Sequence, residues 1–187
     1  MQITPTSLPE VLEITPARFG DHRGFFSETW NRSAMAEAGI DIDFCQDNHS
    51  LSAERHTLRG LHFQAPPSTQ DKLIRVIAGT ILDVAVDIRK GSPTYAQWVA
   101  VELTAETGNQ LFVPKGFLHG FLTLTPDTQV VYKCSDYYAP ETDGGIRWDD
   151  PTIGIEWGVD DVTLSGKDTI APFFADFETP FTYEVQP

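Results

Sequence analysis

Short stretches of alternating apolar and polar residues, separated by turn residues at intervals of about ten positions, constrain this chain more than any other feature. In residues 80–89, for example, Leu82, Val84 and Val86 share one face and Asp83 lies on the other. Alternation with a period of two is the pattern of a strand that buries one face. Many short strands joined by frequent turns are typical of an all-β sandwich or barrel. We therefore expect an all-β protein.

The expected elements run through the chain without a break in composition. A tight turn is expected at residues 19–24, and one helix at 31–38, with Asn31 as its cap and Gly39 as its stop. Neither a repeat nor a low-complexity segment marks a boundary, so residues 1–187 are expected to form one domain. The expected strands are residues 10–14, 24–30, 42–51, 58–64, 72–78, 80–89, 95–103, 111–117, 118–122 and 129–138.

Charge and cysteine content exclude several kinds of partner and site. The formal net charge of -14 argues against nucleic acid or an anionic membrane as a partner, since both need broad positive surfaces. Cys45 and Cys134 provide neither a disulfide framework nor metal-finger spacing, and both are expected to be buried thiols.

The longest apolar run, residues 76–86, is too short to span a bilayer, and the chain opens without a basic and apolar leader. A cytoplasmic protein is expected.

Familiar cofactor and nucleophile motifs are missing from the sequence. The chain has five His, and a β-barrel with several His suggests a metal cupin. Such a site usually needs a His-x-His pair with a nearby carboxylate, and no such pair occurs here. The chain also lacks a Gly-rich phosphate loop and a Gly-x-Ser-x-Gly elbow. We therefore expect neither a catalytic metal nor a cofactor.

An acid and a base are the chemistry that remains. His62 is a candidate base because the ordinary pKa of imidazole lies near neutrality, and either Asp168 or Asp83 could orient its ring. Tyr132 is in phase with the apolar Val130, so it either faces the barrel interior as an acid or packs in the core.

Three cations complete this set. Lys72 could stabilise an enolate oxygen, and Arg23 and Arg59 could hold phosphate oxygens in a bidentate grip. From the pattern alone, each of them is equally explained as an ordinary surface charge.

Blocks of sequence spread over nearly the whole chain resemble those of one family. The most specific block joins residues 59–64, which read Arg-Gly-Leu-His-Phe-Gln, to residues 72–76, which read Lys-Leu-Ile-Arg-Val. Further blocks are residues 20–26, 46–50, 82–89, 91–94, 114–121, 132–134, 137–138, 146–151 and 164–168. With these blocks in this order, the chain closely resembles the dTDP-4-dehydrorhamnose 3,5-epimerase family.

The resemblance implies a fold, an assembly and a reaction. The fold is a metal-free, cupin-like double-stranded β-helix (a jelly roll) with short peripheral helices, in a homodimer that exchanges N-terminal strands. The reaction inverts carbons 3 and 5 of dTDP-4-dehydro-6-deoxy-D-glucose to give dTDP-4-dehydro-L-rhamnose, a step in dTDP-L-rhamnose biosynthesis. Both carbons lie next to the ketone, so their protons are acidic and no redox cofactor is needed.

The resemblance also implies roles for individual residues. His62 is the base, Asp168 its dyad partner, Tyr132 the acid for the opposite face, and Lys72 the cation at the enolate oxygen. Arg23 and Arg59 are expected to bind the diphosphate. Some of the binding residues are expected to reach into the partner subunit's site. The implied substrate-binding residues are Arg23, Glu28, Gln46, Asn48, Arg59, Lys72, His119, Tyr138, Asp143 and Lys167.

Departures from the family pattern leave alternatives open. Asp143 stands where the family commonly has Glu, Lys115 replaces a frequent acidic residue, and Asp71 replaces a frequent Gly. Relatives with the same base and acid invert only one of the two carbons. A monofunctional epimerase for another deoxysugar, a non-catalytic nucleotide-sugar binding protein and a metal cupin oxygenase therefore remain as alternatives.

Overall fold

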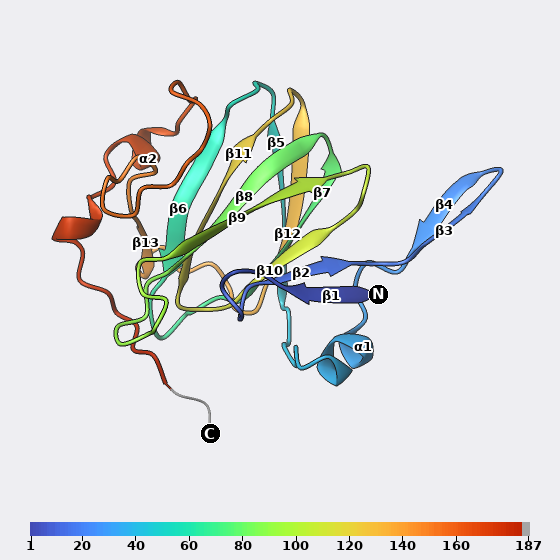
Figure 1. The fold of residues 1–187 in the computed structure, drawn as a ribbon, viewed down its shortest axis with the longest axis horizontal. Helices are drawn as coiled ribbons and strands as arrows, with labels where there is room; N and C mark the ends of the chain where they lie inside the picture. The colour runs from blue at the N-terminus through green and yellow to red at the C-terminus, as the bar shows by residue number, and fades with distance from the viewer. Residues whose placement is uncertain (185–187) are drawn as a thin grey trace.

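The computed structural model describes residues 1–184, and most of its strands form two antiparallel sheets that face each other (Figure 1). The larger sheet has the order β1-β2-β10-β7-β12-β5 and the smaller one β13-β6-β11-β8-β9. The strands are β1 (Gln2–Pro5), β2 (Leu12–Thr15), β3 (Arg18–Asp21), β4 (Gly24–Ser27), β5 (Gln46–Ser52), β6 (Leu58–Gln64), β7 (Lys72–Ala78), β8 (Thr80–Asp87), β9 (Trp98–Thr104), β10 (Gln110–Val113), β11 (Phe117–Thr123), β12 (Thr128–Cys134) and β13 (Asp143–Gly145). The expected all-β, cupin-like jelly roll is confirmed.

Strand β8 shows how the alternating pattern builds the core. Val84 and Val86 are fully buried on the outer face of the smaller sheet, where the C-terminal segment packs. Ala85 lies on the inner face, between the sheets, with Ile74 and Val130 of the larger sheet. Both faces of β8 are therefore buried, whereas the alternation of its residues indicates a strand that buries only one face.

Segments outside the sheets cover their outer faces (Figure 1). The C-terminal segment lies along the smaller sheet and buries Trp157 and Phe181 there. Helix α1 (Arg32–Glu37) buries Met35 against the larger sheet, and Asn31 caps it by accepting a hydrogen bond from the backbone N–H of Ala34. The helix expected at residues 31–38 is thus confirmed. None of the helices within residues 1–184 has the length and apolarity needed to cross a membrane.

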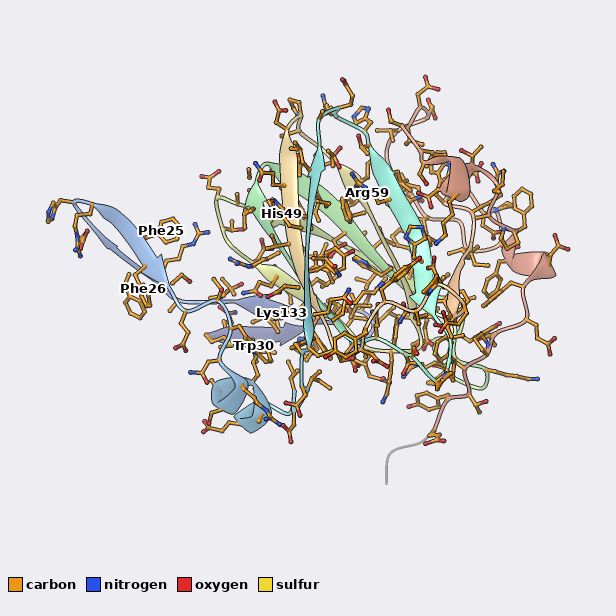
Figure 2. The ribbon with its side chains drawn as sticks, turned by 180° about the vertical axis from the view of Figure 1, so that it is seen from behind. Phe25, Phe26, Trp30, His49, Arg59 and Lys133 are labelled. Atoms are coloured by element: carbon orange, nitrogen blue, oxygen red, sulfur yellow. The ribbon has the colours of Figure 1, made fainter. Side chains whose placement is uncertain are left out.

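Strands β3 and β4 form a hairpin that projects away from both sheets (Figure 1). The sequence predicted a tight turn at residues 19–24 and a strand at 24–30. The predicted strand is present as β4, at Gly24–Ser27. The predicted turn is shorter, because Arg18–Asp21 pairs with β4 and only two residues connect them. Figure 2 shows Phe25 and Phe26 on this arm, where they are 62% and 69% exposed.

Other boundaries differ for reasons of packing. The strand expected from residue 42 begins at Gln46, because Ile42 and Phe44 pack with the α1 cluster instead of joining a ladder. Cys45, expected to be buried, is exposed just before this strand. Two short helices were not predicted, α2 (Gly166–Thr169) and the 3₁₀ helix η1 (Phe174–Asp176).

Candidate active site

Two cavities of about 410 and 380 Å³ open between the sheets and adjoin each other. Both are lined by His62, Lys72 and Tyr132, so these three side chains stand where the cavities meet. Arg59 and His119 line the first cavity, with Asp168. The structure therefore gathers most of the expected site residues around one cleft.

An irregularity in β6 places Arg59 and His62 on the same wall. His62 pairs with His119 of β11, and Arg59 pairs with Phe121. Between these two pairs β6 advances by three residues and β11 by only two. An extra residue of this kind is a β-bulge, and it shifts the alternation of side chains. Gly60 makes the bulge possible: its φ is +134°, and a Cβ there would lie 2.6 Å from the Cα of Gly120.

His62 and Asp168 form a fixed pair. The Nε2 atom of His62 lies 2.6 Å from Oδ1 of Asp168, whose side chain is only 4% exposed. Asp168 lies in the first turn of α2, and its backbone N–H donates to the Oγ of the capping residue Ser165. Because the helix holds the carboxylate, the imidazole ring is oriented toward the cleft by a rigid partner.

A second imidazole–carboxylate pair lies beside the first. His119 sits directly opposite His62 in the β6–β11 ladder, and its Nε2 lies 2.6 Å from Oδ1 of Asp83. Both residues of this pair are buried. The sequence left open whether Asp168 or Asp83 orients His62. In the structure Asp168 contacts His62, and Asp83 contacts His119.

Tyr132 and Lys72 come from the opposite sheet. Tyr132 lies on β12 and Lys72 on β7, the neighbouring strand, whereas His62 lies on β6 of the smaller sheet. Lys72 pairs with Cys134, two residues beyond Tyr132, so the lysine and the phenol share the inner face. A ring bound in the cleft would have the imidazole on one side and the phenol on the other.

Burial, hydrogen bonds and neighbouring charges shift the pKa values of three groups in the cleft. Burial raises the pKa of the Tyr132 phenol, so that it keeps its proton. Burial lowers the pKa of the Lys72 ammonium, which the charges of Cys134, Asp143 and Asp83 oppose. For Asp168, burial acts to raise the pKa, but the hydrogen bond and charge of His62 outweigh it, and the net shift is downward. The Asp168 carboxylate is thus held ionised beside the imidazole.

The second cavity holds the remaining polar residues. Lys167 forms an ion pair with Asp143, to which the Tyr138 hydroxyl also donates, at 3.3 Å. Strand β13 brings Asp143 there by pairing with the end of β6. Gln46 donates to the Oδ1 of Asn48 at 3.1 Å. Amides, a phenol and an ammonium suit the polar edges and charges of a nucleotide.

Two expected binding residues lie elsewhere in this chain. Arg23 stands at the tip of the projecting hairpin and pairs with Asp21 at 2.6 Å. Glu28 follows the hairpin and accepts from the side chain of Asn31 at 3.0 Å. Neither residue lines the two cavities of its own chain.

Some cleft residues were missed by the sequence analysis. Ser50 and Ser165 line the first cavity, and Ser52 accepts from Nε of Arg59 at 3.2 Å. Continuing the alternation from Asn48 would have placed Ser50 and Ser52 on the inner face. Within residues 1–184, no group of three or more His, Cys, Asp or Glu is arranged to hold a metal ion.

The chain is similar to known proteins over nearly its whole length. The family model for dTDP-4-dehydrorhamnose 3,5-epimerase matches residues 5–176. The dTDP-4-dehydrorhamnose 3,5-epimerase of Salmonella typhimurium is 48% identical over 174 residues, which cover 92% of this chain and 94% of that protein.

Crystal structures agree with this similarity. The dTDP-4-dehydrorhamnose 3,5-epimerase of Bacillus anthracis, with TDP and PPi bound, is 46% identical with a TM-score of 0.91, covering 92% of this chain and 99% of that one. The Legionella pneumophila enzyme RmlC, in complex with dTDP-4-keto-L-rhamnose, is 43% identical with a TM-score of 0.94, covering 98% of both chains. This chain therefore belongs to the dTDP-4-dehydrorhamnose 3,5-epimerase family.

Proposed function

We propose that this protein is an isomerase that inverts carbons 3 and 5 of dTDP-4-dehydro-6-deoxy-D-glucose, giving dTDP-4-dehydro-L-rhamnose for dTDP-L-rhamnose biosynthesis. The observation that carries this proposal is the placement of His62 and Tyr132 on opposite sheets, where both line the junction of the two cavities. Inversion needs a proton removed from one face of the carbon and another delivered to the opposite face.

The proposed roles follow from the geometry. His62, oriented by Asp168, removes the proton next to the ketone, and the electron pair of the broken C–H bond moves into an enolate. The ammonium of Lys72 stabilises the negative charge on the enolate oxygen. Tyr132 then gives its phenolic proton to the opposite face of the carbon. Both groups regain their starting protonation by exchange with solvent.

The rest of the cleft is proposed to bind the nucleotide sugar. Arg59 and His119 line the first cavity beside the reacting groups, and Arg59 is assigned to the diphosphate. The remaining polar residues line the second cavity and are assigned to the nucleotide half. They are Gln46, Asn48, Tyr138, Asp143 and Lys167.

Deuterium exchange tests this reaction. Because the proton delivered by Tyr132 comes from solvent, turnover in deuterated water should place deuterium at both carbon 3 and carbon 5 of the product. NMR and mass spectrometry of the sugar measure the label. Label at one carbon alone would identify a monofunctional epimerase, and unlabelled sugar after long incubation would leave only a binding protein.

We also propose that residues 1–187 form one domain, and that it works as a homodimer in which the β3–β4 hairpin of each subunit reaches the cleft of the other. Three phenylalanines on the hairpin, Phe19, Phe25 and Phe26, are more than 60% exposed, and covering them in a partner would bury apolar surface. The same arm carries Arg23, which lines neither of the two cavities of its own chain. Location in the cytoplasm stays a prediction.

Subunit complementation tests the exchange of hairpins. Arg23→Ala and His62→Ala variants should each be weakly active alone. In a heterodimer purified through two tags, one site would combine an intact His62 with an intact Arg23 from the other subunit, so activity should return to about half of wild type. Activity no higher than the mean of the two parent variants would contradict the exchange, as would a fully active Arg23→Ala homodimer.

A further inference from the structure

Strand β5 lines the cleft with a row of four polar side chains. Gln46, Asn48, Ser50 and Ser52 alternate with exposed residues and share the inner face. Three of the four are engaged by the protein itself. Gln46 accepts from the backbone N–H of Tyr138 at 2.9 Å, Asn48 donates to the sulfur of Cys134 at 3.5 Å, and Ser52 accepts from Arg59.

Ser50 is the exception in this row. Its Oγ is buried, and among residues 1–184 it is one of only two buried side-chain polar atoms with no hydrogen-bond partner. The other is Oδ2 of Asp83, the residue that contacts His119. Leaving a buried hydroxyl unpaired is unfavourable, so proteins pair most such groups unless they serve another purpose.

The surroundings of Ser50 place it near the reacting groups. Ser50 lies opposite Val130 on β12, two residues from Tyr132 on the same inner face. It lines the first cavity with His62, Lys72 and His119. Arg59 is tied to the backbone O of Leu51 and to Ser52, so its guanidinium lies next to this part of β5.

We propose that the Ser50 hydroxyl binds a ring hydroxyl of the sugar; this rests on the proposed function. A serine hydroxyl both donates and accepts, as a sugar hydroxyl does, so one pair satisfies both groups. The groups assigned to the nucleotide half, among them Lys167, line the other cavity, whereas Ser50 shares its cavity with Asp168 and His119. Ser50 would thus be a specificity-determining residue beside the base and the acid.

Ser50→Ala separates this role from a structural one. With the full nucleotide sugar, kcat/KM should fall about tenfold, the usual size of one lost hydrogen bond to a buried group. Affinity for dTDP, which lacks the hexose, should be unchanged. The melting temperature should not fall, because no protein hydrogen bond is removed. Ser50→Thr, which keeps the hydroxyl, should retain most of the activity.

Ser52→Ala is the matched control on the same strand face. It removes the acceptor that holds Nε of Arg59, so it should lower the melting temperature, unlike Ser50→Ala. A fall in dTDP affinity in Ser50→Ala equal to its fall in kcat/KM would place the contact on the nucleotide and overturn the proposal. Unchanged kcat/KM in Ser50→Ala would overturn it as well.

Substrate analogues identify the hydroxyl. The 2-deoxy and 3-deoxy forms of the 4-keto sugar should bind wild type more weakly, measured by calorimetry. With one of them, Ser50→Ala should cause no further loss, because the partner is already missing. Equal additional losses with both analogues would contradict a sugar contact. An inactive wild-type protein would instead reject the proposed epimerase function, independently of these binding results.

Discussion

His62→Ala is expected to lower kcat/KM by about three to four orders of magnitude, toward the upper end of what a positioned general base contributes. The loss should appear at both inverted carbons, since His62 lies at the junction of the two cavities and is the imidazole paired with Asp168. Single-turnover rates and deuterium exchange at each carbon measure it. The melting temperature and dTDP affinity should remain near wild type.

Asp168→Asn supplies a sharper version of this test. The amide keeps the size of the side chain but removes the charge that stabilises the imidazolium, so kcat should fall by at least about a hundredfold. Asp83→Asn is the matched control, because Asp83 makes an equally short contact to His119. The control should affect KM for the nucleotide sugar more than kcat. Equal losses of kcat in the two variants would contradict the assignment of His62 as the base.

Lys72→Met should lower kcat by about two to three orders of magnitude, the effect of removing one preorganised group that stabilises an oxyanion. Methionine keeps much of the length of the side chain without its charge, so packing beside Cys134 should be preserved. Binding of dTDP should change little, because the ammonium acts on charge that develops at the sugar. A variant that loses dTDP affinity but keeps kcat would assign Lys72 to nucleotide binding instead.

The pH dependence follows from the same lysine. Because burial lowers the pKa of Lys72 below its ordinary value of 10.5, its positive charge is lost at a lower pH than that of an exposed lysine, as the pH rises through the lowered pKa. Burial raises the pKa of Tyr132 above 10.0, so the acid keeps its proton over a wider range. The alkaline fall of kcat/KM should therefore report Lys72. In Lys72→Arg this fall should move to higher pH, and an unmoved alkaline limb would point to another group.

The local sequence pattern predicts strands well where the strand lies within one of the two main sheets. Strands β6 and β7 match the expected residues 58–64 and 72–78, because a Pro-rich loop separates them and Gly79 ends the second. Strand β3 was not predicted, because the Gly and Asp content of residues 19–24 indicates a turn there. The phenylalanines of the hairpin are exposed and do not pack on the two sheets. Its pairing is decided by contacts that a local pattern does not encode.

The sequence by itself predicted the all-β fold, since period-two alternation tells which residues share a strand face. Its resemblance to a known family supplied the roles of the candidate acid, base and cations. Only the tertiary structure decided how they combine. It selected Asp168, 106 residues beyond His62, over Asp83 as the partner of that imidazole. It turned Arg59 and His62 to one wall through the bulge at Gly60. It also set Tyr132 on the opposite sheet. Strand periodicity specifies a face but not a neighbour, because the neighbour depends on how distant segments pair and pack.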